Sequence, residues 1–263
     1  MNNQSALRRT KHASLILGIV SLIFVSLITC GASLSSDNPS AKTDTTATQI
    51  QLETNSGTTA ANLDDDASQW GIFYDGGTAT ATVQNVLKPS LDGTTLEVSL
   101  ISEQPYVGIH AYRNLAPADT AKTFNLTLSF YFPTVTPIQA LEFTENKWVN
   151  NQRWEWALQW EHIGSGVTTP VWRLWTGSSW QEIGVTQQLA AKKWHKLHLK
   201  GNISRGQVHY ISFSCDSLTV TLGQTFAPVS NPGDKLAAAV QLDGDSQEDP
   251  YQLYIDKVSL QWN

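Results

Sequence analysis

Apolar and polar residues alternate with a period of two along much of this chain, and no other feature restricts the fold as strongly. Residues 94–100, 124–130 and 194–200 show the pattern. Because successive side chains of a strand point to opposite faces, each segment predicts a strand with one buried face. Turn signals such as Leu91-Asp92-Gly93 recur between them. We therefore predict an all-β sandwich of two antiparallel sheets with about twelve to fourteen strands, and a brief helix only at residues 187–193.

A block rich in tryptophan lies near the middle of the chain, at residues 153–161 (RWEWALQWE). On a strand, Trp154, Trp156, Leu158 and Trp160 share one face. We expect this face to be core, because buried indoles can hold two sheets together. The alternate residues would then line the other, concave and wet face of the sheet.

Neighbouring segments extend both faces. In residues 141–146, Leu141 and Phe143 belong with the core, which leaves Glu142, Thr144 and Asn146 on the wet face. Residues 172–175 (WRLW) split in the same way. The predicted exposed patch consists of Glu142, Arg153, Glu155, Gln159, Arg173 and Trp175, with His110 and Tyr112 as further members.

This patch has the side-chain types of a sugar site. Aromatic rings stack on the apolar face of a pyranose, while carboxylate, guanidinium and amide groups bind its hydroxyls. The alternative is a row of cross-strand ion pairs on a solvated sheet.

Residues 254–262 (YIDKVSLQW) resemble the closing strand of jelly-roll domains of the concanavalin A-like lectin and glucanase group and of carbohydrate-binding modules. Residues 140–159, 172–175 and 194–197 are similar to secreted or surface proteins of soil bacteria that mostly lack an assigned activity. The resemblance covers about residues 70–263. It implies a jelly-roll fold, and one sandwich hosts many functions. Together with the mixed aromatic and polar face, it leads us to predict a domain that binds a polysaccharide or other glycan and is not a catalyst.

Two enzyme classes of this fold remain open, and so does a structural or adhesive surface protein that binds protein partners. A glycosidase needs two carboxylates about 5 to 9 Å apart, for which Glu142 and Glu155 are the pair. They lack the Glu-x-Asp-x-x-Glu spacing of the related glucanases. A polysaccharide lyase would use the types found at Tyr112, Arg153, Gln159 and His162, which lack the Gln-Ile-His or Gln-Val-His spacing of alginate lyases.

The N-terminus carries an export signal. Arg8, Arg9 and Lys11 precede an apolar run that ends at Cys30. Residues 27–30 (LITC) resemble a lipobox, in which Cys30 would be lipidated, but Thr29 departs from that pattern. An uncleaved anchor and simple secretion are the alternatives. Each predicts an extracytoplasmic domain, and the first two attach it to the membrane.

The predicted organisation has three parts: residues 1–30 as signal or anchor, residues 31–66 as a flexible linker, and residues 67–263 as the sandwich. The linker is rich in Ser, Thr, Ala and Asp, and such a composition buries too little apolar surface to fold. Its closing acidic triplet, residues 64–66, is expected in solvent.

Charge and cysteine content argue against a nucleic-acid partner and against a disulfide. The net charge is −6, and without a basic stripe we predict no nucleic-acid partner. With Cys30 in the signal, Cys215 has no disulfide partner, and we expect it to be a small buried apolar residue.

Carboxylates crowd the C-terminal region. Asp243, Asp245 and Asp256 could hold a structural calcium ion, which takes six to eight oxygen ligands. Turn-forming acids in solvent explain the same residues without a metal.

Overall fold

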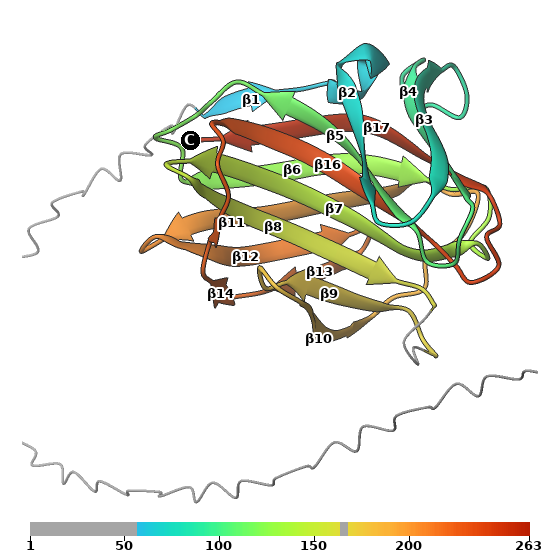
Figure 1. The fold of residues 1–263 in the computed structure, drawn as a ribbon. Coiled ribbons are helices and arrows are strands. Elements are labelled where there is room, and N and C mark those ends of the chain that lie inside the picture. The colour runs from blue at the N-terminus through green and yellow to red at the C-terminus, as the bar shows by residue number, and fades with distance from the viewer. Residues whose placement is uncertain (1–56, 164–167) are drawn as a thin grey trace, which may run out of the picture. The chain divides into compact units, whose positions relative to one another are not determined.

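The structure is a computed structural model that describes residues 57–163 and 168–263. These residues form two antiparallel sheets stacked face to face, with two short 3₁₀ turns at Leu63–Asp65 and Ala67–Gln69 (Figure 1). The predicted two-sheet antiparallel jelly-roll sandwich is confirmed.

One sheet has nine strands: β1 (Thr58–Ala60), β3 (Ala79–Val86), β4 (Thr95–Ser102), β6 (Thr123–Tyr131), β11 (His195–Ser204), β12 (Gln207–Cys215), β13 (Leu218–Thr221), β14 (Thr225–Phe226) and β17 (Tyr251–Trp262). Its order is β13-β12-β11-β6-β17-β4-β3, with β1 paired to β17 and β14 to β12.

The other sheet has eight strands: β2 (Trp70–Asp75), β5 (Gly108–Leu115), β7 (Ile138–Val149), β8 (Gln152–Glu161), β9 (Val171–Trp175), β10 (Trp180–Thr186), β15 (Val229–Ser230) and β16 (Lys235–Gly244). Its order is β10-β9-β8-β7-β16-β5-β2, with β15 paired to β8. The strands outnumber the prediction because several, such as β14 and β15, are only two residues long.

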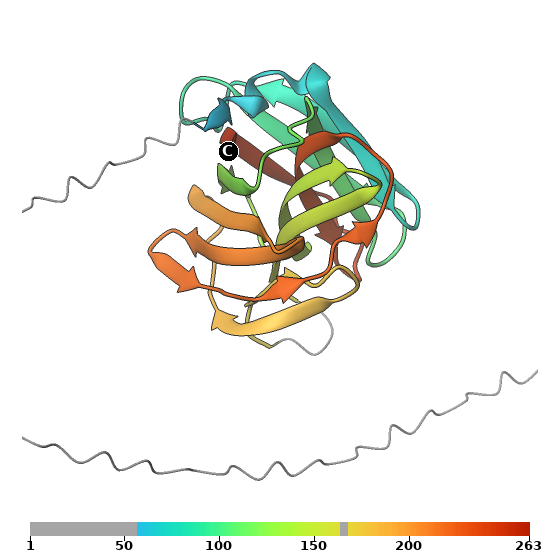
Figure 2. The ribbon, with the colours of Figure 1, turned by 90° about the vertical axis from the view of Figure 1, so that its left-hand side faces the viewer.

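One apolar core lies between the sheets, and Figure 2 shows both sheets curving around it. Trp154, Trp156 and Trp160 are buried there, as strand parity predicted. Their indole N–H groups donate to backbone carbonyls; that of Trp156, for example, lies 3.1 Å from His209 O. A β carbon at Gly201 would overlap the Trp156 ring, so β11 needs glycine to let the indole pack against its backbone. The indole N–H groups of the three tryptophans are therefore satisfied within the core.

Two smaller expectations about the core region can also be checked. Cys215 is buried and free of any disulfide, as predicted, and burial raises the pKa of its thiol to about 12. Residues 187–193, in contrast, form an irregular loop and a turn rather than a helix. That segment is held by tertiary contacts: Trp160 Nε1 donates to Gln187 O at 2.8 Å. Such contacts override a weak local preference.

The predicted linker ends too late in the sequence. Strand β1 pairs with β17, and Asp64 is only 1% exposed, with Oδ1 accepting the N–H of Val258 at 2.7 Å. Burial raises the pKa of Asp64 to about 6, and the hydrogen bond from Val258 opposes this shift. Residues 57–66 thus belong to the sandwich, and the expectation that this acidic triplet lies wholly in solvent is wrong. Residues 31–56 lie outside the described part.

The predicted signal or anchor, residues 1–30 with Cys30, also lies outside the described residues. Within residues 57–163 and 168–263, none of the helical segments has the length and apolar character needed to cross a bilayer.

Candidate functional site

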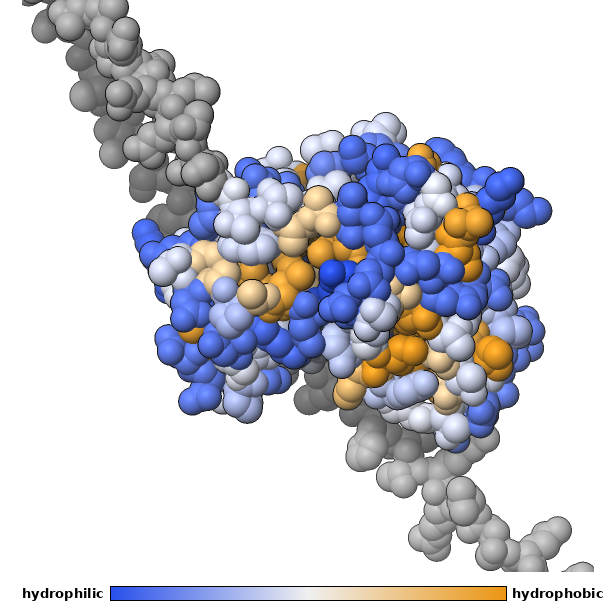
Figure 3. Space-filling model, turned by 90° about the horizontal axis from the view of Figure 1, so that it is seen from above, coloured by the Kyte–Doolittle hydropathy of each residue, from blue (hydrophilic) through white to orange (hydrophobic). Residues whose placement is uncertain are grey.

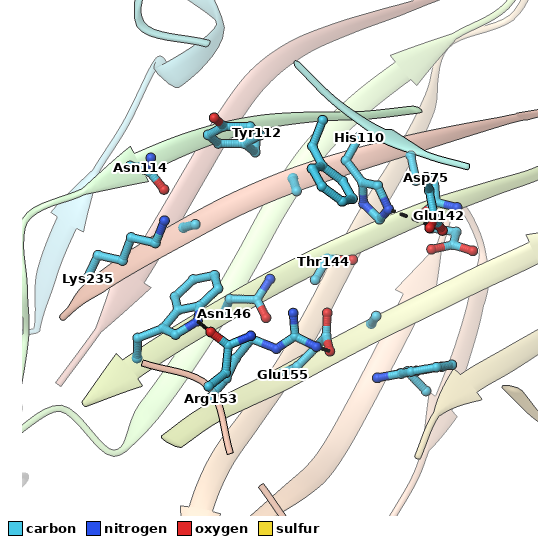
Figure 4. A pocket seen from close by; sticks show the side chains of 18 of the residues that line it. Asp75, His110, Tyr112, Asn114, Glu142, Thr144, Asn146, Arg153, Glu155 and Lys235 are labelled. Atoms are coloured by element: carbon cyan, nitrogen blue, oxygen red, sulfur yellow. Dashed lines mark hydrogen bonds and ion pairs between the residues drawn. The ribbon is translucent and has the colours of Figure 1, made fainter. Parts of the chain in front are cut away.

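A groove of about 670 Å³ lies on the outer face of the eight-stranded sheet (Figure 4). Side chains that alternate with the buried ones on β5, β16, β7 and β8 form it, so the same parity that builds the core also builds the groove. The predicted concave surface is therefore present.

The floor of the groove consists of small residues. Ala239 on β16 pairs with Thr144 on β7, which pairs with Ala157 on β8. On the next row Ala237 lies opposite Asn146. Because the three central strands carry short side chains here, space remains above them between the longer side chains of the flanking strands.

Aromatic residues wall the groove on two sides. Trp175 on β9 and Trp180 on β10 face each other with ring centroids 5.3 Å apart. Across the groove lie Tyr112 on β5 and Phe73 on β2, and Phe73 is 58% exposed. A β carbon at Gly71 would lie 2.6 Å from the Tyr112 hydroxyl oxygen, so this glycine allows the Tyr112 ring to lie over β2.

One end of the groove is acidic. Glu142 on β7 is 5% exposed, and its Oε1 accepts a hydrogen bond from Gln159 Nε2 at 2.9 Å. Asp243 Oδ1 accepts from Gln241 Nε2 at 2.7 Å. Asp75 Oδ2 lies 3.8 Å from His110 Nε2. We name Asp75, Glu142 and Asp243 the acidic end.

Burial is the largest cause of the pKa shifts at the acidic end. It raises the pKa of Glu142 well above its ordinary value, and the nearby charge of Asp243 adds to the shift. It raises the pKa of Asp243 to about 7, opposed by the hydrogen bond from Gln241. Burial lowers the pKa of His110, opposed by Asp75. Glu142 and Asp243 are therefore protonated more readily than exposed carboxyl groups.

The other end holds the basic residues. Arg153 Nη2 lies 2.7 Å from Glu155 Oε2, and Lys235 Nζ lies 4.7 Å from the ring centroid of Trp148. Asn146 is 8% exposed and points into the groove (Figure 4). Its Oδ1 accepts no hydrogen bond from the described residues. A buried acceptor of this kind needs a donor from a ligand or from water.

Five of the seven predicted sugar-binding residues line the groove: Tyr112, Glu142, Arg153, Glu155 and Trp175. Gln159 lies beside them and holds Glu142. Arg173 is not part of the lining, because it pairs with Glu161 and with Glu182, whose Oε1 lies 3.0 Å from Nη2. For Arg173 the alternative interpretation, a cross-strand ion pair, describes the geometry. His162 also lies apart, with Nδ1 3.1 Å from Ile138 O.

Sequence reasoning missed several groove residues: Phe73, Asp75, Trp148, Trp180 and Lys235. Trp180 follows Trp175 across the short connection of residues 176–179, and this spacing could have placed the two rings side by side. No local signal places Asp75 or Lys235 there, because β2 and β16 reach the groove through pairings between distant segments.

The three aspartates of the predicted calcium site are engaged separately. Asp243 binds Gln241; Asp245 Oδ1 accepts from Gln247 N at 2.8 Å. Asp256, in the other sheet, accepts from Leu91 N at 2.7 Å. No three His, Cys, Asp or Glu side chains in the described part are grouped so that they could hold a metal ion. These residues do not fit the calcium site we predicted.

Comparisons with known proteins place the fold. No family model matches the chain, and no curated protein sequence matches it. An endo-β-1,4-glucuronan lyase from the fungus Trichoderma reesei is similar in structure, with a TM-score of 0.51 and 11% identity over 76% of this chain and 94% of that one. The lectin UEA-II, solved with galactose, has a TM-score of 0.50 and 12% identity over 78% and 98%. A cellulose-induced protein has a TM-score of 0.50 and 10% identity over 76% and 96%. At such identities the likeness establishes the fold alone, a two-sheet jelly roll.

Proposed function

We propose that this protein binds carbohydrate in the groove of its eight-stranded sheet and is held outside the cytoplasmic membrane by its N-terminal segment. The observation that carries the proposal is the groove itself. Its walls are aromatic, its floor consists of small side chains, and polar side chains lie at both ends. Sugar rings present an apolar face and a rim of hydroxyls, which match aromatic walls and polar ends respectively.

The fold comparison is in keeping with this proposal. Two of the proteins of similar fold are a lectin solved with galactose and a glucuronan lyase. Because one fold supports many activities, the proposal rests on the geometry of the groove, and the likeness in fold is supporting evidence only.

A direct test is the binding of the full-length chain, in detergent, to a glycan array and to insoluble polysaccharides. The matched pair of variants is Ala157→Leu, which fills the floor, and Thr82→Leu, which adds the same side chain to the exposed outer face of the nine-stranded sheet. We expect binding by the wild type and by Thr82→Leu, and loss of binding in Ala157→Leu. If no neutral, cationic or anionic glycan is retained by the wild type, the proposed function is wrong.

Attachment outside the membrane rests on the sequence of residues 1–30. We propose lipidation at Cys30, with an uncleaved anchor as the alternative. Incorporation of a labelled fatty acid into the wild type but not into Cys30→Ser is the expected result. Equal membrane retention of both, without label, would favour the anchor.

A second candidate function is cleavage of a glycan in the same groove. The observation that favours it is that His110 and Tyr112, two residues apart on β5, both face the groove, and that His110 lies near Glu142 (Figure 4). Such side chains can transfer protons. Release of reducing ends, or absorbance of an unsaturated uronic product, by the wild type and not by Glu142→Gln or His110→Ala would make the protein an enzyme.

A structural or adhesive role would instead need a broad apolar surface. On the face that Figure 3 shows, hydrophobic residues form separate patches between hydrophilic ones. The exposed large apolar residues include Phe73, Tyr74, Leu87 and Tyr106, of which Phe73 already belongs to the groove. Protein docking through such a surface therefore has less support than a groove ligand.

A further inference from the structure

The acidic end of the groove contains three carboxyl groups. Three strands of the sheet bring its members together: β2 carries Asp75, β7 carries Glu142 and β16 carries Asp243. Registers place Ala140 opposite Asp243 and Glu142 opposite Gln241, so the two carboxyl groups lie on adjacent rows of the same face. A β carbon at Gly108 would lie 2.5 Å from Asp243 Oδ1, so this glycine makes room for the carboxyl group between β16 and β2.

In the described residues, none of these three carboxyl groups forms an ion pair with lysine or arginine. Arg153 is held by Glu155, and Arg173 by Glu161 and Glu182. Asp75 has only His110, 3.8 Å away. Glu142 and Asp243 have amide donors, from Gln159 and Gln241, and a proton held by Glu142 can join the two carboxyl groups in a hydrogen bond. Buried charges are normally paired, so this end of the groove is incomplete without a cation or bound protons.

Other groups in the groove are also acceptors without donors. Asn146 Oδ1 and Gln159 Oε1 accept no hydrogen bond from the described residues, and both side chains are more than nine-tenths buried. A ligand that satisfies both must therefore supply N–H or O–H donors beside Glu142, for Gln159, and toward the basic end, for Asn146. An ammonium group supplies three donors and a positive charge.

We propose that the acidic end binds the ammonium group of an amino sugar, so that the ligand is a glycan with free, non-acetylated amino groups. This inference rests on the proposed function, because the aromatic walls must hold the sugar ring that carries the amine. Metal coordination is the poorer alternative, since the described carboxylates form no group of three suited to a metal ion. A polyuronate is disfavoured because its carboxylates would meet Asp75, Glu142 and Asp243.

The test compares matched oligosaccharides on the full-length protein by titration calorimetry. The probes are a fully deacetylated hexamer of glucosamine, its N-acetylated counterpart, and a trilysine peptide as a cation without sugar rings. We expect the deacetylated hexamer to bind at least about tenfold more tightly than the acetylated one, because a hydrogen bond between charged groups is lost on acetylation. The preference should shrink in 1 M salt, where exposed charges are screened.

The variant Asp75→Asn removes a negative charge at nearly constant shape, and Glu142→Gln removes a carboxyl group that can ionise against the ammonium group. We expect each to reduce the preference for the amine, while Glu97→Gln, on the nine-stranded sheet, leaves it unchanged. Asp75 is more than half exposed, so Asp75→Asn keeps the test valid if Glu142→Gln fails to fold.

The outcomes separate the inference from the proposed function. Equal binding of the acetylated and deacetylated hexamers overturns the inference and leaves carbohydrate binding intact. Trilysine binding as tight as that of the deacetylated hexamer also overturns it, because the site would then recognise cations without sugar. Absence of binding to every glycan, including neutral ones on the array, overturns the proposed function itself.

Discussion

The two faces of the eight-stranded sheet use the same strands in opposite ways. On the inner face, the indole N–H groups of Trp154, Trp156 and Trp160 all have backbone acceptors, at 3.3, 3.1 and 2.8 Å. On the outer face, Asn146 Oδ1 and Gln159 Oε1 have no donor in the described part. The indoles of the inner face have their partners within this chain, whereas amide oxygens of the outer face have hydrogen-bonding capacity left for something else.

The difference means that stability and binding should be separable by strand parity. Residues one position apart on β8 or β9 face either a packed core or a groove. Substitutions that alter unfolding should therefore alternate along the strand with substitutions that alter ligand affinity.

The largest effect is expected for Trp156→Ala on the inner face. The Trp156 ring packs 4.8 Å from that of Phe124 and against the backbone at Gly201, so truncation leaves a cavity. We expect the free energy of unfolding to fall by about 3–5 kcal/mol, measured by urea denaturation. A loss below about 1 kcal/mol would show that this face is not close-packed.

A buried carboxyl group next to the core should have the next largest effect. The pKa of Asp64 is about 6 in the folded protein, above its ordinary 3.8, so folding favours the protonated form. The stability that this proton contributes is fully present below pH 4 and lost as pH rises through 6. We expect Asp64→Asn to be more stable than the wild type by about 1–3 kcal/mol at pH 7.5, and close to it at pH 4. Parallel stability curves from pH 4 to 7.5 would contradict this.

Trp175→Ala tests the outer face. Its ring lines the groove rather than the core, so we expect glycan affinity to fall about tenfold or more, with a stability change within about 1 kcal/mol. Binding is measured by calorimetry and stability by urea denaturation on the same preparation. A large loss of stability with unchanged affinity would reverse the assignment of the two faces.

The smallest effect is expected from an aromatic residue outside the groove. Tyr131 lies between Trp194 and Tyr254 on the outer face of the nine-stranded sheet, with ring centroids 5.6 and 5.8 Å away. Because these rings are tilted toward each other rather than lined up as a flat platform, we expect Tyr131→Ala to leave glycan affinity within about twofold. A loss equal to that of Trp175→Ala would place a binding surface on the other sheet.

The sequence predicted which side of each strand is buried. Trp172 and Leu174 are in the core, and Arg173 and Trp175 are not, as alternation required. It also predicted five residues of the groove lining. It did not predict that Glu142 and Gln159 would be almost completely covered, because cover comes from side chains on neighbouring strands.

The sequence failed where a residue's role depends on contacts distant along the chain. Asp64 looked like a solvated linker residue, yet it is bound by Val258 N at 2.7 Å. Asp243 looked like a loop ligand for calcium, yet it lies on β16 beside Glu142 and Gln241. A segment remote in sequence supplies the partner of Asp64, and a remote strand, β7, places Glu142 on the row next to Asp243.

By itself, then, the sequence determined the β class, the parity of the strands and the aromatic and polar character of the outer face, because alternation is a local property of each strand. The tertiary structure alone decided which strands are neighbours. The order β9-β8-β7-β16-β5-β2 brings Trp175, Glu142, Tyr112 and Asp75 around one groove, with Asp243 on the row next to Glu142. Pairing between distant strands follows from the closure of whole sheets around the core, and no local pattern encodes it.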